Sequence, residues 1–374
     1  MINPFQYGGI VGPEAFCNRA QELHDLKRAA TNGDRLLIYA ERRLGKTSLV
    51  KHVLDSLSKQ DFLPIYIDLW ATGGTASFVK TAAKAIAEAA ATRADKLLET
   101  SKELFRHLIP SLTLDESGNP LIQFGARSGI EREHALEDVL EAPAKLAQKH
   151  SRRVVVVYDE IQQIMDYGDD TVERTLRSHM QMHQRIAYFL LGSRKHLIQR
   201  LFRDRNRPLY QSAGFYPLGP IRTEDWVPFI RERFEAARKP MAEAHIEALC
   251  AWTEGHPFYT QHLAHAVWEI TPEGEAVTEE ILQAALALLL RRVSYPYMVL
   301  WESLTSNQQQ LLWGLAAEVL PAKPFAQAFL KKYDLAASSA HRAAAGLLER
   351  DVVDREGEGF IISDRFFRLW IQRL

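Results

Sequence analysis

The chain has 374 residues, which predicts two or three domains because a typical domain contains about 150 residues. Its 46 lysines and arginines nearly balance 47 aspartates and glutamates, and 47% of its residues are apolar. These values are typical of globular proteins and exclude collagen, a coiled coil or global disorder, and the net charge of −1 argues against nonspecific nucleic-acid binding by the whole molecule.

The cysteine spacing and the short apolar runs predict a reducing, cytoplasmic location and no membrane segment. Cys17 and Cys250 lie far apart and form no Cys-x-x-Cys pair, so we expect neither a disulfide framework nor a thiolate metal site. A reducing, cytoplasmic location fits this. Residues Met1 to Gly12 lack the basic and apolar segments of a signal peptide, and the longest apolar run, Ala284 to Leu290, is far shorter than the ~18 residues that span a bilayer. No membrane segment is expected.

The first 220 residues alternate helical patterns with short apolar runs. The expected helices are Leu23 to Ala30, Lys46 to Leu57, an alanine-rich helix capped by Ser77 and ending near Leu98, Glu131 to Gln148, and Val172 to Gln184. The expected strands are Leu36 to Tyr39, Phe62 to Trp70, Val154 to Tyr158, and Ala187 to Leu191. A hairpin with a turn at Ser117 to Asn119 is expected between Ser111 and Phe124. Repeated βαβ units predict an α/β fold with a parallel sheet covered on both faces.

After Pro220 the pattern becomes helical. Four helices are expected at Thr223 to Phe234, His245 to Trp252, Pro257 to Trp268, and Thr278 to Arg292. A third unit has helices at Asn307 to Glu318, Phe325 to Tyr333 and Ser338 to Glu349, and then strands at Asp351 to Val353 and Phe360 to Ile362. We therefore expect an α/β domain over 1–220 with a hairpin insertion near 111–125, a helical lid over 221–296, and a winged helix over 297–374.

A phosphate-binding loop is predicted between the first strand and its helix. It comprises Ala40, Glu41, Arg42, Arg43, Leu44, Gly45, Lys46, Thr47 and Ser48. In such a loop the backbone N–H groups and the helix N-terminus face the phosphates, Lys46 supplies charge, and the Thr47 hydroxyl ligates Mg²⁺. Ala40 replaces the usual first glycine, which is tolerable if its φ is negative. The alternative is a chance Gly-Lys-Thr at a helix start.

Two further strand ends carry candidate catalytic groups. Asp159 and Glu160 follow the valine-rich strand, where Asp159 would hold Mg²⁺ through water and Glu160 would deprotonate the attacking water. A solvated turn or a helix cap is the alternative for these acids. Ser193 and Arg194 follow the fourth strand and could reach the γ-phosphate, although Arg194 could equally pair with a carboxylate.

These motifs resemble the archaeal-type ATPase family of P-loop proteins, close to the STAND class and the wider AAA+ group of the ASCE division. The matching segments are Phe16 to Arg19 with Glu22, Arg42 to Leu49, Asp159 to Gln162, Gly192 to Arg194, Pro208 to Tyr210, Gly255 to Tyr259, and Ile362 to Trp370. The resemblance implies a sheet in the order 5-1-4-3-2, a helical lid and a C-terminal winged helix. It also implies that the segment containing Arg19 packs near adenine and that Gly255 and Pro257 close over the nucleotide. ATP rather than GTP rests on this resemblance, and no guanine-reading Asn-Lys-x-Asp is present.

The partner of the winged helix is left open between duplex DNA and a protein. Residues 301–374 carry nine basic and nine acidic residues, and the expected recognition helix offers only His341 and Arg342. The most basic stretch, 185–210, contains seven basic residues and one acid, and it could bind phosphates or form a solvated helix face. Any of Arg200, Arg203, Arg205 and Arg207, or none, could act as an arginine finger.

The function predicted from the sequence is an ATP-binding, Mg²⁺-dependent ATPase that acts as a nucleotide-driven switch, for which slow turnover would suffice. The alternatives are an ATP-dependent DNA-binding regulator with incidental hydrolysis, and a scaffold that holds ADP permanently. An oligomer is compatible with each of these. His179 and His183 have the i, i+4 spacing of metal ligands, but without a third ligand nearby we expect them to be packed or surface histidines.

Overall fold

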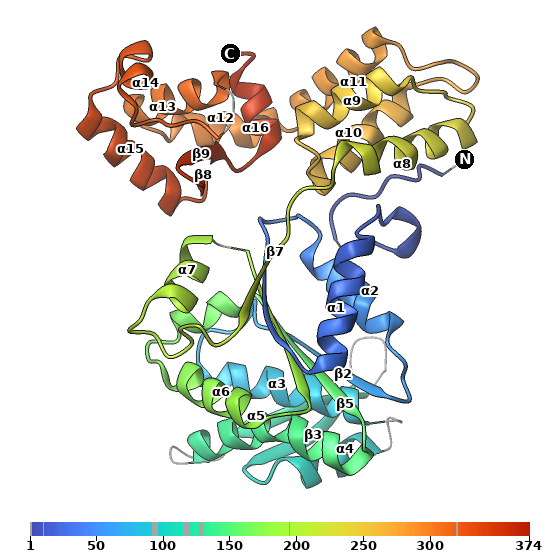
Figure 1. Ribbon diagram of the computed structural model, residues 1–374, viewed down its shortest axis with the longest axis vertical. Coiled ribbons are helices and arrows are strands. Elements are labelled where there is room, and N and C mark those ends of the chain that lie inside the picture. The colour runs from blue at the N-terminus through green and yellow to red at the C-terminus, as the bar shows by residue number, and fades with distance from the viewer. Residues whose placement is uncertain are drawn as a thin grey trace. The chain divides into compact units, whose positions relative to one another are not determined.

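The chain forms two compact units. The computed structural model describes residues 2–9, 11–91, 96–114, 120–126, 131–193, 195–318 and 321–374. One unit is Arg19–Gly219, and the other combines Met1–Asn18 with Pro220–Leu374. The first unit is built around a parallel sheet and the second is mostly helical (Figure 1), so the predicted α/β fold class is confirmed.

Five parallel strands make the central sheet of the first unit. They are β1 (Arg35–Tyr39), β2 (Phe62–Asp68), β5 (Arg153–Asp159), β6 (Ile186–Gly192) and β7 (Gly214–Pro217). Their spatial order is β2-β5-β6-β1-β7, which is the 5-1-4-3-2 order implied by the resemblance. The apolar pattern did not predict β7, because this edge strand is largely exposed and has no continuous apolar run.

Helices cover both faces of this sheet (Figure 1). The helices of the unit are α1 (Ala20–Asn32), α2 (Lys46–Ser56), α3 (Thr75–Ala90), α4 (Leu97–Leu104), α5 (Glu131–His150), α6 (Thr171–Met182) and α7 (Lys195–Arg203). Val154, Val156 and Tyr158 of β5 share a core with α3, α5 and α6, while the alternate residues Val155 and Val157 are also fully buried. Burial on both sides explains why β5 reads as an unbroken apolar run.

The expected extent of the alanine-rich helix needs correction. The alanine-rich helix begins at Thr75 and ends at Ala90, and α4 starts separately at Leu97, with residues 92–95 outside the described part. Ser77 lies inside α3, where its hydroxyl accepts the backbone N–H groups of Gly73 and Gly74 at 3.0 and 3.1 Å. The hairpin consists of β3 (Leu108–Leu114) and β4 (Pro120–Ala126); its predicted turn, 117–119, lies outside the described residues.

The second unit contains two helical cores. The lid core is formed by α8 (Thr223–Ala236), α9 (Glu243–Thr253), α10 (Pro257–Ile270) and α11 (Glu279–Arg292), together with Phe5 from the N-terminal segment. The winged-helix core is formed by α13 (Ser306–Ala317), α14 (Gln327–Lys332), α15 (Ala337–Glu349), β8 (Val353–Glu356) and β9 (Gly359–Ile362). The short 3₁₀-helix η1 (Pro13–Ala15) also belongs to this unit, whereas a second 3₁₀-helix, η3 (Ile161–Asp166), belongs to the α/β unit. Across the described ranges, no helix is both long and apolar enough to cross a membrane.

Two helices that the periodicity did not predict join these cores. They are α12 (Ser294–Glu302) and α16 (Arg365–Ile371). In α16 the neighbouring rings of Phe366 and Phe367 separate: Phe366 packs in the lid core, 4.9 Å from the ring of Tyr259, and Phe367 packs in the winged-helix core. The side chain of Asp364 caps this helix by accepting the N–H groups of Phe366 and Phe367. Both cores therefore depend on this one helix.

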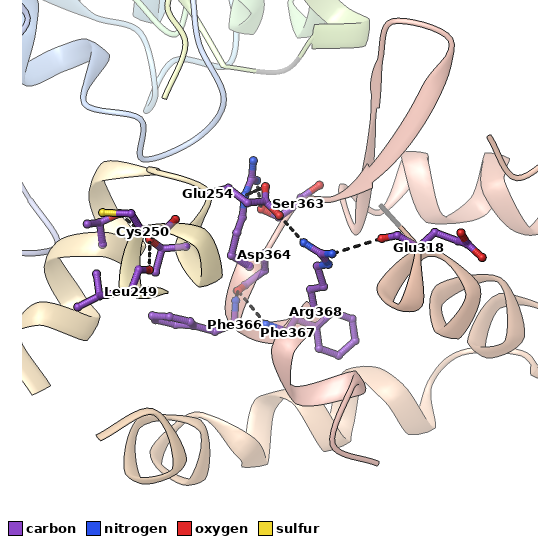
Figure 2. A network of polar contacts seen from close by, with 12 residues as sticks. Leu249, Cys250, Glu254, Glu318, Ser363, Asp364, Phe366, Phe367 and Arg368 are labelled. Atoms are coloured by element: carbon purple, nitrogen blue, oxygen red, sulfur yellow. Dashed lines mark hydrogen bonds and ion pairs between the residues drawn. The ribbon is translucent and has the colours of Figure 1, made fainter. Parts of the chain in front are cut away.

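A polar clamp, defined as Glu254 with Arg365 and Arg368, fixes α16 to the end of α9. The Glu254 carboxylate accepts Arg365 Nε at 3.0 Å and Arg368 Nη1 at 2.7 Å. Figure 2 shows Arg368 reaching from Glu254 toward Glu318, whose backbone oxygen accepts its other terminal nitrogen at 3.4 Å. Glu254 has a positive φ of 55° and directly precedes Gly255, so the clamp holds the turn before α10.

We expect Glu254→Gln to lower the free energy of unfolding of the second unit by about 2 kcal/mol, because two charge-assisted hydrogen bonds weaken and the buried Arg365 loses its counter-charge. Chemical unfolding measures this. Glu358→Gln is the matched control, since the Glu358–Lys323 pair is exposed, and it should change stability by less than ~0.5 kcal/mol. Equal effects of the two substitutions would contradict the clamp.

A second buried ion pair lies in the α/β unit. Glu173 of α6 is fully buried and contacts Arg207, which lies in the loop after α7. Burial raises the pKa of Glu173 to about 7, although the Arg207 guanidinium opposes this shift. The folded chain therefore binds more protons than the unfolded chain between about pH 4.5 and 7, so this carboxyl lowers stability as the pH rises through that window.

Glu173→Gln should remove this pH dependence. Relative to the variant, the wild type should lose on the order of 3 kcal/mol of unfolding free energy between pH 4.5 and pH 8. Thermal unfolding at several pH values measures the difference, with Glu88→Gln on the half-exposed Lys84 pair as control. A constant difference across the window would show that Glu173 keeps an ordinary pKa.

Candidate functional site

The predicted phosphate-binding loop lies between β1 and α2. Gly45 precedes α2 with φ of +86°, a conformation that favours glycine, and a Cβ added there would meet no atom within 4 Å. Ala40 is fully buried, has no positive φ, and donates its N–H to the Gly192 oxygen at 3.2 Å. Its methyl group is therefore accommodated without backbone strain, and the loop is tied to the end of β6.

The two predicted acids meet this loop at the carboxyl edge of the sheet. Lys46 Nζ lies 3.2 Å from Glu160 Oε1 and 3.7 Å from Asp159 Oδ1. The Thr47 hydroxyl donates to Asp159 Oδ2 at 2.7 Å. The side chains of Lys46 and Asp159 are each 6% exposed, so these charges interact in a partly desolvated site. The structure thus brings together Lys46, Thr47, Asp159 and Glu160.

Lys46 contacts Glu160 Oε1, and two further donors contact the other carboxylate oxygen, Oε2. The Ser193 hydroxyl donates to Glu160 Oε2 at 2.8 Å, and the Gln162 amide donates to the same oxygen. Glu160 has a positive φ of 54°, a rare conformation for a residue with a side chain that is often found at functional sites. Arg194, the remaining predicted catalytic residue, lies outside the described residues.

The other predicted nucleotide contacts divide between the two units. Arg19 is buried in the α/β unit, where it pairs with Glu22 at 2.8 Å and donates to the Leu44 oxygen of the loop at 3.5 Å. Ser48 is buried in the first turn of α2, whereas Arg42 and Arg43 are exposed. Pro257 is the first residue of α10 in the second unit. Its predicted role at the nucleotide stays a prediction.

The donor set fits a magnesium ion. Asp159 and Thr47 offer a carboxylate and a hydroxyl, the hard oxygen ligands that Mg²⁺ prefers, and such an ion keeps several waters and takes further oxygens from substrate phosphates. The positive Lys46 and two neighbouring acids leave the cluster with a net negative charge. A divalent cation would be stabilised by this charge.

Tyr66 is a member of the site that sequence reasoning missed. Its hydroxyl donates to Asp159 Oδ2, and Lys51 Nζ lies 4.8 Å from the centre of its ring. Burial and then the Asp159 charge raise the pKa of Tyr66 well above its usual value. In the sheet register Tyr66 lies opposite Val157 and Asp68 opposite Asp159, so Tyr66 is a diagonal neighbour of Asp159. The one feature of the sequence that could have indicated this role is the position of Tyr66, two residues before the end of β2 at the same edge of the sheet.

The two histidines predicted to be packed or at the surface, His179 and His183, are buried beside two acids. His179 Nε2 lies 3.1 Å from Glu137 Oε2, and His183 Nε2 lies 3.4 Å from Glu141 Oε2. Burial lowers the pKa of His183. No group of three or more histidines, cysteines, aspartates or glutamates that could hold a metal ion occurs in the part of the chain that the structure describes.

The arginines of the basic stretch differ in their surroundings. Arg207 is engaged with the buried Glu173, and Arg203 lies 5.4 Å from the centre of the exposed Phe215 ring. Arg200, Arg203 and Arg205 are exposed. Arg207 is therefore the member of this set that is tied to the fold, which leaves the other three as the arginine-finger candidates of the sequence.

Comparisons with known proteins identify the family and the fold. A family model described as an ATPase domain predominantly from Archaea matches residues 16–263, and a model described as "Probable winged helix domain" matches residues 295–373. The Walker-type ATPase of Pyrococcus abyssi has a similar structure, with a TM-score of 0.67, 17% identity, and 98% of this chain and 99% of that chain covered.

Two structures of the Aeropyrum pernix ORC2 protein are also similar. The ADPNP–ADP complexes give a TM-score of 0.54 at 15% identity, covering 95% of this chain and 94% of that chain. The ADP form gives 0.53 at 14% identity, covering 97% and 96%. At these identities the likeness concerns the fold. No curated protein matches the sequence at a significant level.

Ala40→Gly should leave the affinity for ATP within twofold of the wild type, because the Ala40 methyl group is accommodated without a positive φ. It should lower the free energy of unfolding by about 1 kcal/mol through the loss of a buried methyl group and the extra freedom of glycine. Titration with ATP and chemical unfolding test the two parts. A gain in affinity of tenfold would show that the alanine distorts the loop.

Proposed function

Because the chain belongs to the family described as an ATPase domain predominantly from Archaea, we propose that it binds ATP at the Ala40–Ser48 loop and hydrolyses it. The observation that carries this proposal is the convergence of Lys46, Thr47, Asp159 and Glu160 at one edge of the sheet. These residues come from two motifs more than a hundred positions apart in sequence. A chance Gly-Lys-Thr would have no reason to meet them.

The roles of the side chains follow from their chemistry. Lys46 and the N-terminus of α2 would bind the phosphates, and Thr47 and Asp159 would hold Mg²⁺, directly or through water. When bound, the ion would stabilise charge on the phosphate oxygens. Glu160 would accept the proton of the attacking water, and Ser193 lies close enough to Glu160 to take part in the same hydrogen-bond network.

Binding of ATP would first have to separate Lys46 from the two acids. Lys46 Nζ lies 3.2 Å from Glu160, so the ammonium group that would contact phosphate is already paired with the carboxylate that would activate water. Phosphate oxygens would replace the carboxylate as partners of Lys46. Glu160 would then be released as a base, which makes hydrolysis dependent on correctly bound nucleotide.

A switch role is the second part of the proposal. The second unit carries Gly255 and Pro257, which by the family resemblance would close over the nucleotide, and the clamp at Glu254 joins this turn to α16 and the winged helix. A change in the turn on nucleotide binding would therefore act on the winged helix as well. Such a two-state element biased by γ-phosphate is a common way to use hydrolysis as a signal.

The winged-helix match favours a second candidate, an ATP-dependent DNA-binding regulator. The surface charges favour a protein partner instead: Lys323 pairs with Glu358 and Lys332 with Glu318. On α15, His341 stacks on Phe325 with ring centres 3.8 Å apart, which leaves Arg342 as the charged exposed residue in the middle of that helix. DNA binding that weakens steeply with added salt would support the regulator.

Lys46→Ala should abolish ATP binding, and Glu160→Gln should bind ATP while releasing phosphate at least ~10²-fold more slowly, because the general base is lost. Binding is measured as stabilisation: Mg-ATP at 100 times its dissociation constant should raise the unfolding free energy by ~2.7 kcal/mol in the wild type and in Glu160→Gln. Steady-state phosphate release, with and without duplex DNA, measures turnover.

Glu232→Gln, on an exposed residue of α8, is the matched control and should behave as the wild type. Equal phosphate release by wild type and Glu160→Gln would remove Glu160 from the role of base. A wild type that binds ATP without any turnover would instead support the scaffold that holds nucleotide permanently.

A further inference from the structure

We infer that Tyr66 and Gln162 are positioning residues that hold the two neighbouring acids in separate tasks: Tyr66 fixes Asp159 for the metal, and Gln162 fixes Glu160 for the attacking water. This inference rests on the proposed ATPase function and deepens it. The two acids are adjacent in sequence and equally able to bind a cation or a proton, so their division of labour has to come from their surroundings. The hydrogen bonds of the site differ for the two residues in the way this division requires.

Asp159 is oriented toward the phosphate-binding loop by three donors. The Tyr66 and Thr47 hydroxyl groups both donate to Oδ2, and the backbone N–H of Glu160 donates to Oδ1 at 2.9 Å. Two of these donors are fixed by the backbone or by α2, and Tyr66 supplies the one that comes from the neighbouring strand β2. Removing a group that orients a metal-binding side chain typically weakens metal affinity 10- to 100-fold.

Tyr66 reaches Asp159 because of the parallel register of β2 and β5. Phe62 to Asp68 pair in order with Arg153 to Asp159, which places the Tyr66 ring one diagonal step from Asp159 on the same face of the sheet. Lys51 of α2 lies over the same ring. The ring thus lies against both β5 and α2, and its hydroxyl donates to Asp159.

Gln162 acts on Glu160 instead. It is 2% exposed, and its amide nitrogen donates to Glu160 Oε2 and lies 3.5 Å from the Ser193 hydroxyl. Because an ionised carboxylate only accepts hydrogen bonds, the amide must present its nitrogen to Glu160. With Ser193, Gln162 therefore fixes one oxygen of Glu160 while Lys46 contacts the other.

Holding Glu160 in this way carries a structural penalty. Within the described residues, the Gln162 Oε1 atom is buried and has no hydrogen-bond partner, which lowers the stability of the fold. Space is also restricted: a Cβ at Gly192 would lie 3.2 Å from this oxygen and 2.1 Å from Ile198 Cδ1. A buried amide with one unused acceptor, beside a residue with positive φ, is expected where position matters more than stability.

The test compares Tyr66→Phe and Gln162→Met in the full chain. Tyr66→Phe should weaken the contribution of Mg²⁺ to ATP affinity about tenfold, measured by calorimetric titration of ATP with Mg²⁺ and with EDTA, and should leave kcat at saturating Mg²⁺ within twofold. Gln162→Met should lower kcat at least tenfold and leave both ATP affinities within twofold. The two variants thus separate metal binding from turnover.

Two matched controls make the same amino-acid changes, Tyr to Phe and Gln to Met, at positions outside the site. Tyr188→Phe removes a hydroxyl of β6 that contacts His183, and Gln163→Met removes the amide beside Gln162 that donates to the Trp70 oxygen at 3.5 Å. Neither should change the Mg²⁺ dependence or kcat. If Gln162→Met fails to fold, as judged by its unfolding midpoint, Gln162→Leu takes its place in the same assays.

The inference is overturned if Tyr66→Phe leaves the Mg²⁺ dependence of ATP affinity unchanged, or if Gln162→Met lowers ATP affinity as much as it lowers kcat. It is also overturned if both variants shift both quantities together, since that would indicate general loosening of the site. A wild type that releases no phosphate would refute the proposed hydrolysis by itself. The Mg²⁺ titration of Tyr66→Phe needs no turnover, so the two failures are distinguishable.

Discussion

One buried ammonium group organises the carboxyl edge of the sheet. Lys46 Nζ lies between Asp159 and Glu160, and its side chain is only 6% exposed. An isolated charge at this depth would be strongly unfavourable, so lysine and acids have to be placed together by the fold. One positive and two negative charges leave an excess that a cation can neutralise. The surrounding hydrogen bonds, the loop conformation and the strand register all serve to keep these three groups in contact.

The strands that build this edge were predictable in proportion to their burial. In β5 and β6 nearly every residue is buried, so the unbroken apolar run identified both. β7 is exposed along most of its length and gave no such signal, although the family resemblance implied a fifth strand. The short helices α12 and α16 were not predicted from the sequence for a different reason. The helix α12 has no buried residue, and α16 divides its apolar residues between two cores.

The side chains of the site were likewise predictable only where local sequence determines their position. Lys46, Thr47, Asp159 and Glu160 were found because a strand end or a helix start fixes each of them by local sequence. Tyr66 and Gln162 were not assigned a role, because their partners are set by the register between β2 and β5 and by the left-handed conformation of Glu160. Neither of these is encoded in a short motif. The clamp around Glu254 is also non-local, since its arginines lie 111 and 114 residues further along the chain.

The separation of Phe366 and Phe367 has a thermodynamic consequence for the second unit. Each of these adjacent rings belongs to a different core, and the same short helix supplies the arginines that hold Glu254. Melting of the winged helix would thus strip an aromatic ring from the lid and leave Glu254 without its counter-charges. We therefore expect the lid and the winged helix to unfold as one cooperative block, in a single transition, although this block contains two hydrophobic cores.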